Sequence, residues 1–268
     1  MGSYILLLLS ISDLLYCKPM GVFKNKQLPA RLQNGTPTQE VAAARRKYLL
    51  RDLHKEVSQR QTRINTDFSN GFKVLSKYSN TVTFFGSARL TEGNAHYEHA
   101  RSIAATLAQN GYTIVTGGGG GIMEAANRGA YEAGGNSIGF NIQLPKEQSL
   151  NHYISDSTPF RYFFSRKVLL AYSAQAYVYF PGGFGTLDEL FEIMTLIQTH
   201  KMEKAPIILV GTAFWGPLDA YIKTVLRDEF KTIHSKDTDL YTITDDTEQI
   251  LRVLRNYKRK QLKEIFSN

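Results

Sequence analysis

The glycine-rich stretch "PGGFGTLDE", residues 181–189, contains residue types that could do chemistry at a useful spacing. Glycines leave backbone N–H groups open to a phosphate, and the start of a helix favours an anion. A carboxylate beside such a turn can stabilise positive charge or orient water during bond cleavage, and Glu189 is placed to supply it. The alternative is structural, because Thr186 and Glu189 also form the pattern of a helix capping box. The candidate phosphate-binding residues are Gly182, Gly183, Gly185 and Thr186.

Two other turns follow short apolar runs. "TGGGGGIMEAANRGA" places five glycines, Gly117 to Gly121, directly after "YTIVT", and an ordinary turn does not need so many. Their backbone N–H groups could approach a phosphate or sugar, so Gly118, Gly119 and Gly120 are candidate substrate contacts. Tight packing of a strand against a helix is the alternative. "FFGSARL" adds Ser87 as a weaker candidate, for which an ordinary turn is an equally good explanation.

Several common cofactor and metal motifs are missing from the sequence. Neither glycine turn fits G-x-G-x-x-G, because Glu124 and Asp188 occupy the last position that the pattern needs. Asn141 stands where the acidic residue that binds an NAD ribose would be expected. There is no G-x-x-x-x-G-K-[ST] motif, and the six histidines lack metal-ligand spacing. We therefore expect no cofactor and no metal, and an NAD-linked oxidoreductase is a disfavoured alternative.

The elements that must position these turns alternate between strand-like and helix-like patterns across residues 79–251. The strand-like runs are "TVTFFG", "YTIVTG", "NSIGFNI", "AYVYFPG" and "PIILVG". Continuous apolar runs of this kind indicate strands buried on both faces of a parallel sheet. The sequence thus predicts an α/β fold, a doubly wound parallel sheet, with ligands bound at the carboxyl ends of the strands.

Both ends of the chain are basic. Residues 18–78 carry 13 Lys/Arg and 4 Asp/Glu, residues 252–268 carry 6 and 1, and the whole chain is +8. We expect an N-terminal helical extension over 39–78, broken into two helices at Asn70–Gly71, and a basic C-terminal helix or tail over 252–268. The basic excess lies outside the predicted sheet domain, so solvated helix faces explain it better than nucleic-acid binding does.

The segment 1–38 is predicted to be flexible, or else its start is misassigned and translation begins at Met20 instead of Met1. Its apolar run "YILLLLSISDLLYC" is too short to span a bilayer, and it lacks the preceding positive charge and the cleavage site of a signal peptide. We expect no membrane association. Cys17 is the only cysteine, which is typical of a reducing compartment and predicts a cytoplasmic location.

Four segments together resemble the LOG (Lonely Guy) family, whose members were long misnamed lysine decarboxylases. They are "GGGGGIMEAANRGAYEAGG", "LP" at Leu144 and Pro145, "SRK" over 165–167, and "PGGFGTLDE". The resemblance covers roughly 82–230 and is closest to longer bacterial members. It implies a Rossmann-like fold, a homodimer, and hydrolysis of a nucleoside 5′-monophosphate, such as a cytokinin riboside monophosphate or AMP, to free base and ribose 5-phosphate.

The resemblance also implies roles for single residues. Arg166 and Glu189 match the catalytic pair of the family, and Lys167 and Thr195 match substrate contacts. A carboxylate suits this reaction, because cleavage of a glycosidic bond builds oxocarbenium-like positive charge on the sugar. A nucleotide-binding sensor without catalysis is the alternative function. Helical spacing predicts one buried face, formed by Leu187, Leu190, Phe191, Met194 and Ile197.

Overall fold

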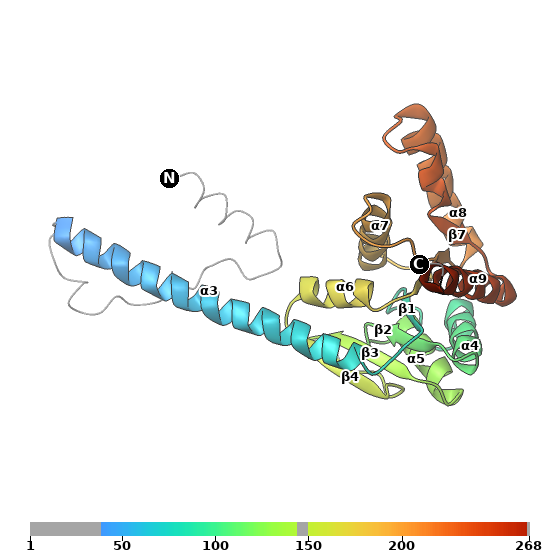
Figure 1. Cartoon of the computed structure of the whole chain (residues 1–268), viewed down its shortest axis with the longest axis horizontal. Coiled ribbons are helices and arrows are strands. Elements are labelled where there is room, and N and C mark those ends of the chain that lie inside the picture. The colour runs from blue at the N-terminus through green and yellow to red at the C-terminus, as the bar shows by residue number, and fades with distance from the viewer. Residues whose placement is uncertain (1–38, 144–149, 267–268) are drawn as a thin grey trace.

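The computed structural model describes residues 39–143 and 150–266, and in that part the chain forms a seven-stranded, wholly parallel sheet covered by helices (Figure 1). The strand order is β4-β3-β2-β1-β5-β6-β7. The strands are β1 (Thr81–Phe85), β2 (Thr113–Thr116), β3 (Ser137–Ile142), β4 (Asp156–Phe160), β5 (Ala176–Tyr179), β6 (Ile207–Leu209) and β7 (Tyr241–Ile243). The predicted doubly wound α/β fold is confirmed.

Helices lie on both faces of the sheet. They are α3 (Gln39–Leu75), α4 (Ala95–Gln109), α5 (Ile122–Glu132), α6 (Phe163–Tyr172), α7 (Phe184–Gln198), α8 (Thr212–Tyr221) and α9 (Thr247–Phe266), with a π-helical segment η2 (Ile222–Glu229) and a 3-10 helix η3 (Ser235–Asp239). Side chains of α3, α6, α7 and α8 join one core cluster, and those of α4, α5 and α9 join the other.

Alternation along the central strands builds these two cores. In β1, Phe85 belongs to the first core and Phe84 to the second, and in β5 the same holds for Tyr179 and Val178. Because both faces are buried, the strands read as continuous apolar runs, and all five predicted strands are present. Two edge strands were missed. One of them, β4, has the sequence "DSTPF", and a proline is tolerated at a sheet edge.

The predicted break at Asn70–Gly71 is wrong, because α3 is a single helix over Gln39–Leu75. A Cβ placed on Gly71 would lie 2.7 Å from Leu169 Cγ and 3.0 Å from Phe160 Cζ. The glycine therefore allows α3 to approach α6 and β4 closely, and this packing offsets the cost of a glycine in a helix, about 1 kcal/mol. The N-terminal part of α3 extends away from the sheet domain (Figure 1).

The structure describes only some of the residues to which the other predictions for the chain ends apply. The C-terminal helix α9 begins at Thr247, so the predicted boundary at 251/252 falls inside a helix, and Ile250, Leu251 and Leu254 are buried in the second core. The predictions for residues 1–38, including Cys17, and for Leu144 and Pro145 lie outside the described residues. Within the described ranges, no helix is both long and apolar enough to cross a membrane.

Candidate active site

The two central strands, β1 and β5, create the crevice in which open parallel sheets bind ligands. From β1 the chain continues to β2 on one side, whereas β6 follows β5 on the other side. The loops leaving β1 and β5 diverge there, as at the ligand-binding crevices of doubly wound folds. Ser87 N nevertheless donates to Pro181 O at 3.0 Å, so the two loops remain fixed relative to each other at this edge.

A cavity of about 670 Å³ opens at this crevice. Its size falls in the usual range of small-molecule sites. The predicted site residues that line it are Ser87, Arg166, Gly183, Gly185, Thr186 and Glu189. Apolar walls come from Phe85, Met123, Ile142, Phe163 and Leu170. The cavity thus combines an apolar surface with a few convergent polar groups, as ligand sites do.

The first turn of α7 lies at the cavity with its backbone donors uncapped. The helix begins at Phe184 with Gly183 as N-cap, and no side chain makes a capping hydrogen bond. A capping box of Thr186 and Glu189 is therefore wrong, since Thr186 already lies inside the helix. A Cβ on Gly183 or Gly185 would meet no protein atom within 4 Å. Internal packing does not explain these two glycines, whereas room for a ligand beside an anion-binding helix terminus does.

The requirement for glycine at position 182 differs from that at Gly183 and Gly185. A Cβ there would collide with the side chain of Thr186, so a glycine is needed for Thr186 to occupy its buried position. Gly182 is not part of the cavity lining and supports the turn from behind.

Arg166 of α6 and Glu189 of α7 meet at the cavity. Arg166 Nη2 lies 3.8 Å from Glu189 Oε1, and the two side chains are 14% and 17% exposed. This distance allows ionic attraction but exceeds a hydrogen bond. The Arg166 Nε is buried and has no hydrogen-bond partner among the described residues, and its guanidinium carbon lies 5.4 Å from the centre of the Phe163 ring. Both groups thus retain hydrogen-bonding capacity toward the cavity.

Burial determines the electrostatics of this pair. It raises the pKa of Glu189 to about 7, against the opposing charges of Arg166 and Lys167. Burial also lowers the pKa of Arg166, while the charge of Glu189 acts in the other direction. Glu189 is therefore held near the point at which it can gain or lose a proton at neutral pH, which is the range that acid–base catalysis uses.

Comparison with known proteins points to one family. A family profile described as "Possible lysine decarboxylase" matches residues 123–254, which include α6, α7 and the turn between β5 and α7. A probable cytokinin riboside 5'-monophosphate phosphoribohydrolase of Oryza sativa subsp. japonica is 27% identical, over 58% of this chain and 74% of its own length. The cytokinin riboside 5'-monophosphate phosphoribohydrolase of Rhodococcoides fascians is 25% identical, over 57% of this chain and 78% of its own.

Over these residues the chain resembles the LOG family. A solved structure agrees on the fold: the molybdenum cofactor carrier protein of Chlamydomonas reinhardtii superposes with a TM-score of 0.51 at 21% identity, covering 68% of this chain and 99% of that one. At this identity the likeness concerns the fold alone.

The second glycine turn of the LOG motif set has a structural role in this chain. Gly117 lines the cavity, but the predicted contacts Gly118, Gly119 and Gly120 do not. Asn151 bonds this turn instead, with its N–H donating to Gly118 O and its Nδ2 to Gly119 O, each at 3.0 Å. The turn therefore packs against Asn151, in the segment before β4, and this contact differs from the strand-against-helix packing considered from the sequence.

Two further residues assigned through the LOG resemblance lie away from the cavity lining. Lys167 Nζ forms ion pairs with Asp188 at 2.8 Å and Glu192 at 3.0 Å. Thr195 is exposed, and its hydroxyl donates to Phe191 O. The predicted buried face of α7 is also partly wrong, because Phe191 is 38% exposed whereas Leu190 and Ile197 are buried.

The structure adds cavity residues that the sequence reasoning missed. Arg89 follows Ser87 in the loop after β1, and its N–H donates to Ser87 Oγ at 3.1 Å. Phe184, in the LOG glycine turn, is 93% exposed at the cavity. Their position in the sequence could have indicated them, because both residues lie in turns that follow the two central strands.

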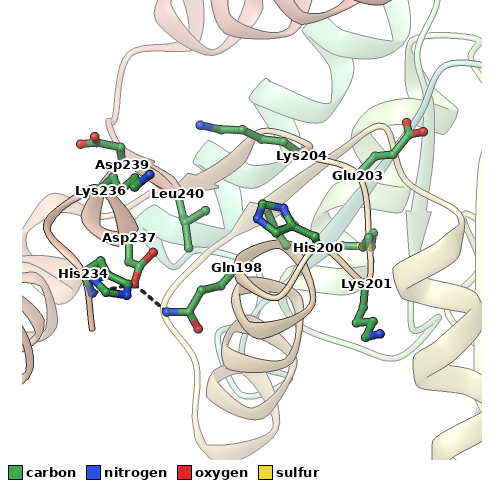
Figure 2. A pocket seen from close by; sticks show the side chains of 12 residues that line it. Gln198, His200, Lys201, Glu203, Lys204, His234, Lys236, Asp237, Asp239 and Leu240 are labelled. Carbon is green, nitrogen blue, oxygen red and sulfur yellow. Dashed lines mark hydrogen bonds between the residues drawn. The ribbon is translucent and has the colours of Figure 1, made fainter. Parts of the chain in front are cut away.

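A larger cavity, of about 880 Å³, lies at the opposite end of α7 (Figure 2). The end of α7 and the loop after it form one side, and η3 with its flanking residues forms the other, where Gln198 Nε2 donates to Asp237 Oδ2 at 2.7 Å. Its lysines and histidines, such as Lys201 and His234, are solvent-exposed and it contains no LOG motif residue. On the basis of the residues that line each cavity, the smaller cavity is therefore the candidate active site.

No group of three or more His, Cys, Asp or Glu side chains that could hold a metal ion occurs within residues 39–143 and 150–266.

Proposed function

We propose that this protein hydrolyses the N-glycosidic bond of a nucleoside 5′-monophosphate, releasing the free base and ribose 5-phosphate. The observation that carries the proposal is the pairing of Arg166 with Glu189, 3.8 Å apart, in a cavity that also contains an uncapped helix N-terminus. Relatives with this reaction in their names add support.

The substrate phosphate binds at the start of α7. N–H groups of the first helical turn and the Thr186 hydroxyl are donors for phosphate oxygens, and the helix dipole favours the negative charge. The absence of side chains at Gly183 and Gly185 leaves room for the phosphate to approach the backbone. Arg89, at the exposed rim of the same cavity, adds positive charge.

Glu189 acts on the sugar, one helical turn after Thr186. The bond between C1′ and the base nitrogen breaks with its electron pair going to the base, and the carboxylate stabilises the positive charge that develops on the sugar. A water oxygen then bonds to C1′ and gives its proton to Glu189, while the base nitrogen takes a proton from solvent. Arg166 attracts the carboxylate across 3.8 Å, and its guanidinium, whose Nε has no hydrogen-bond partner in the described part of the chain, donates to the ribose.

The substrate base is an adenine or an N6-substituted adenine of the cytokinin type. Relatives named for cytokinin riboside 5'-monophosphates support this choice, and the apolar wall of Phe85, Phe163 and Leu170 suits a flat aromatic base. Incubation with AMP, followed by chromatography of the base and a coupled assay for ribose 5-phosphate, tests the proposal. Equal amounts of adenine and ribose 5-phosphate support it, whereas AMP binding without product would identify a nucleotide sensor.

We also propose that the protein acts as a homodimer in the cytoplasm. The dimer is the arrangement that the resemblance implies, and two-fold symmetry is the commonest among soluble homo-oligomers. Light scattering at micromolar concentration should give twice the chain mass of 30.2 kDa. A mass equal to one chain would refute the dimer.

A further inference from the structure

We propose that Asp67, on the N-terminal helix α3, is a positioning residue for the active site: its carboxylate fixes the first turn of α6 and thereby the placement of Arg166. The helical extension is then part of the catalytic unit, although none of its residues lines the cavity. The catalytic readouts below rest on the proposed nucleotide hydrolysis.

Asp67 is a buried carboxylate that the mechanism does not otherwise use. It is 1% exposed. Its Oδ2 accepts from Arg161 N at 2.9 Å and from Ser165 Oγ at 3.1 Å, and its Oδ1 accepts from Arg161 Nη1 at 3.0 Å. A buried charge is costly unless it is paired and hydrogen-bonded, so these contacts hold the carboxylate against the segment 161–165.

The segment that Asp67 holds is the N-terminus of α6. The helix starts at Phe163, and the side chain of its own N-cap residue, Tyr162, makes no capping bond. Asp67 supplies an anion there from another helix, which the helix dipole favours. Ser165, whose hydroxyl is shared between Asp67 at 3.1 Å and the Tyr162 backbone oxygen at 2.9 Å, is fully buried and directly precedes Arg166. This contact gives a role to the serine of the "SRK" motif.

The docking of α3 makes this contact rigid. Four residues beyond Asp67, Gly71 allows α3 to approach α6 closely, at Leu169. One turn before Asp67, Arg63 Nε donates to the Tyr162 hydroxyl at 3.3 Å. The extension therefore contacts α6 at its start and along its length, on either side of Arg166.

Displacement of Arg166 would also change the ionisation of Glu189. Arg166 and Lys167 lower the pKa of Glu189, whereas burial raises it most and Asp188 and Glu192 raise it further. Tyr179 of β5 also interacts with Glu189 and donates to its backbone oxygen. If the first turn of α6 loosens, the lowering effect of Arg166 weakens, so the acidic limb of the activity profile should move to higher pH.

The test compares Asp67→Asn with Asp156→Asn. Asp156 is a matched control, because it accepts hydrogen bonds from Lys77 and Tyr78 just after α3, at 2.8 and 3.1 Å, and its bonds anchor this segment to β4 without involving α6. We expect Asp67→Asn to lower kcat for AMP about tenfold or more, with a smaller change in KM, and to raise the midpoint of the acidic limb. Asp156→Asn should change neither quantity.

Hydrogen exchange supplies a readout that does not depend on the reaction. Amides of α6 should exchange faster in Asp67→Asn, whereas those of α5 should not, and Asp156→Asn should leave α6 unchanged. If Asp67→Asn does not fold, Ser165→Ala removes one of the three contacts and should show the same changes at smaller size. Unchanged exchange and kcat in a folded variant, or equal losses in Asp156→Asn, would overturn the proposal. A wild-type protein that does not cleave AMP would refute the hydrolysis and leave the exchange test valid.

Discussion

Arg166 Nη2 and Glu189 Oε1 lie 3.8 Å apart where α6 and α7 meet the central cavity. The distance is too long for a hydrogen bond, so neither group uses up its hydrogen-bonding capacity on the other. A substrate group placed between them would therefore find a donor on one side and a carboxylate on the other.

Replacement of the carboxylate by an amide should separate chemistry from structure. Because Glu189 caps no helix, Glu189→Gln removes charge without removing a cap. We expect turnover of AMP to fall at least about 100-fold, the usual effect of removing one well-placed electrostatic group, while the fold is retained. Steady-state kinetics and circular dichroism check this. Near wild-type turnover in the variant would show that Glu189 is not the catalytic carboxylate.

The pH dependence should follow the ionisation of Glu189, whose pKa is raised to about 7 mainly by burial. If the carboxylate is the active form, kcat/KM falls as pH drops below about 7. The pH dependence of stability should have the opposite sign to that of activity. A pKa that is raised in the folded state stabilises the folded protein below the unfolded-state pKa of 4.5, and this stabilisation is lost as pH rises through 7.

Glu189→Gln is the control for both pH effects. From pH 5 to pH 8, its free energy of unfolding should rise relative to the wild type. The residual activity of the variant should lose the acidic limb. An acidic limb that persists in Glu189→Gln would assign the titration to another group.

Gly185→Ala should affect stability and activity in opposite directions. Gly185 lies in the first turn of α7 with open space beside it, so alanine should stabilise the helix by about 0.5 to 1 kcal/mol. The added methyl group stands where we place the phosphate, so KM for AMP should rise about tenfold. Gly216→Ala is the control, since Gly216 is also helical and open but lies in α8. Equal KM values for the two variants would contradict a phosphate site at Gly185.

Gly121→Ala should be strongly destabilising. Gly121 has φ of +65°, and a Cβ there would collide with Ser87 O and lie 2.7 Å from Ala88 Cα. Backbone strain and the collision together should lower the free energy of unfolding by about 3 kcal/mol. Gly134→Ala is the control, because φ is +72° with no atom within 4 Å, and it should cost only about 1 kcal/mol. Similar losses in urea unfolding would show that the contact with Ser87 is unimportant.

Much of the fold could be predicted from the sequence, because burial on both faces produces apolar runs that are easy to read. The features that could not be predicted have physical explanations. The strand β4 lies at an edge, where "DSTPF" needs neither continuous apolar character nor every backbone donor. Gly71 breaks no helix, because it lies against Leu169 on another element, and no local pattern records that contact.

The candidate site was predictable in its residues more than in its geometry. Glu189 was a candidate from its place beside the glycine turn, whereas the role of Arg166 came from the family resemblance, and their proximity depends on how α6 and α7 pack. The capping box failed because α7 starts at Phe184, so Gly185 and Thr186, which read as part of the loop, are already helical. Asp67 had no signal at all, since its contact with Ser165 joins segments far apart in the chain.

The central claim is tested most directly by measuring adenine release from AMP and from adenosine side by side. The two substrates differ only in the phosphate that we place at the start of α7. We predict that AMP is cleaved to adenine and ribose 5-phosphate, with kcat/KM at least about 100-fold above that for adenosine, because the phosphate contributes binding free energy that adenosine lacks. Equal turnover of the two, or no adenine from AMP, would contradict the account.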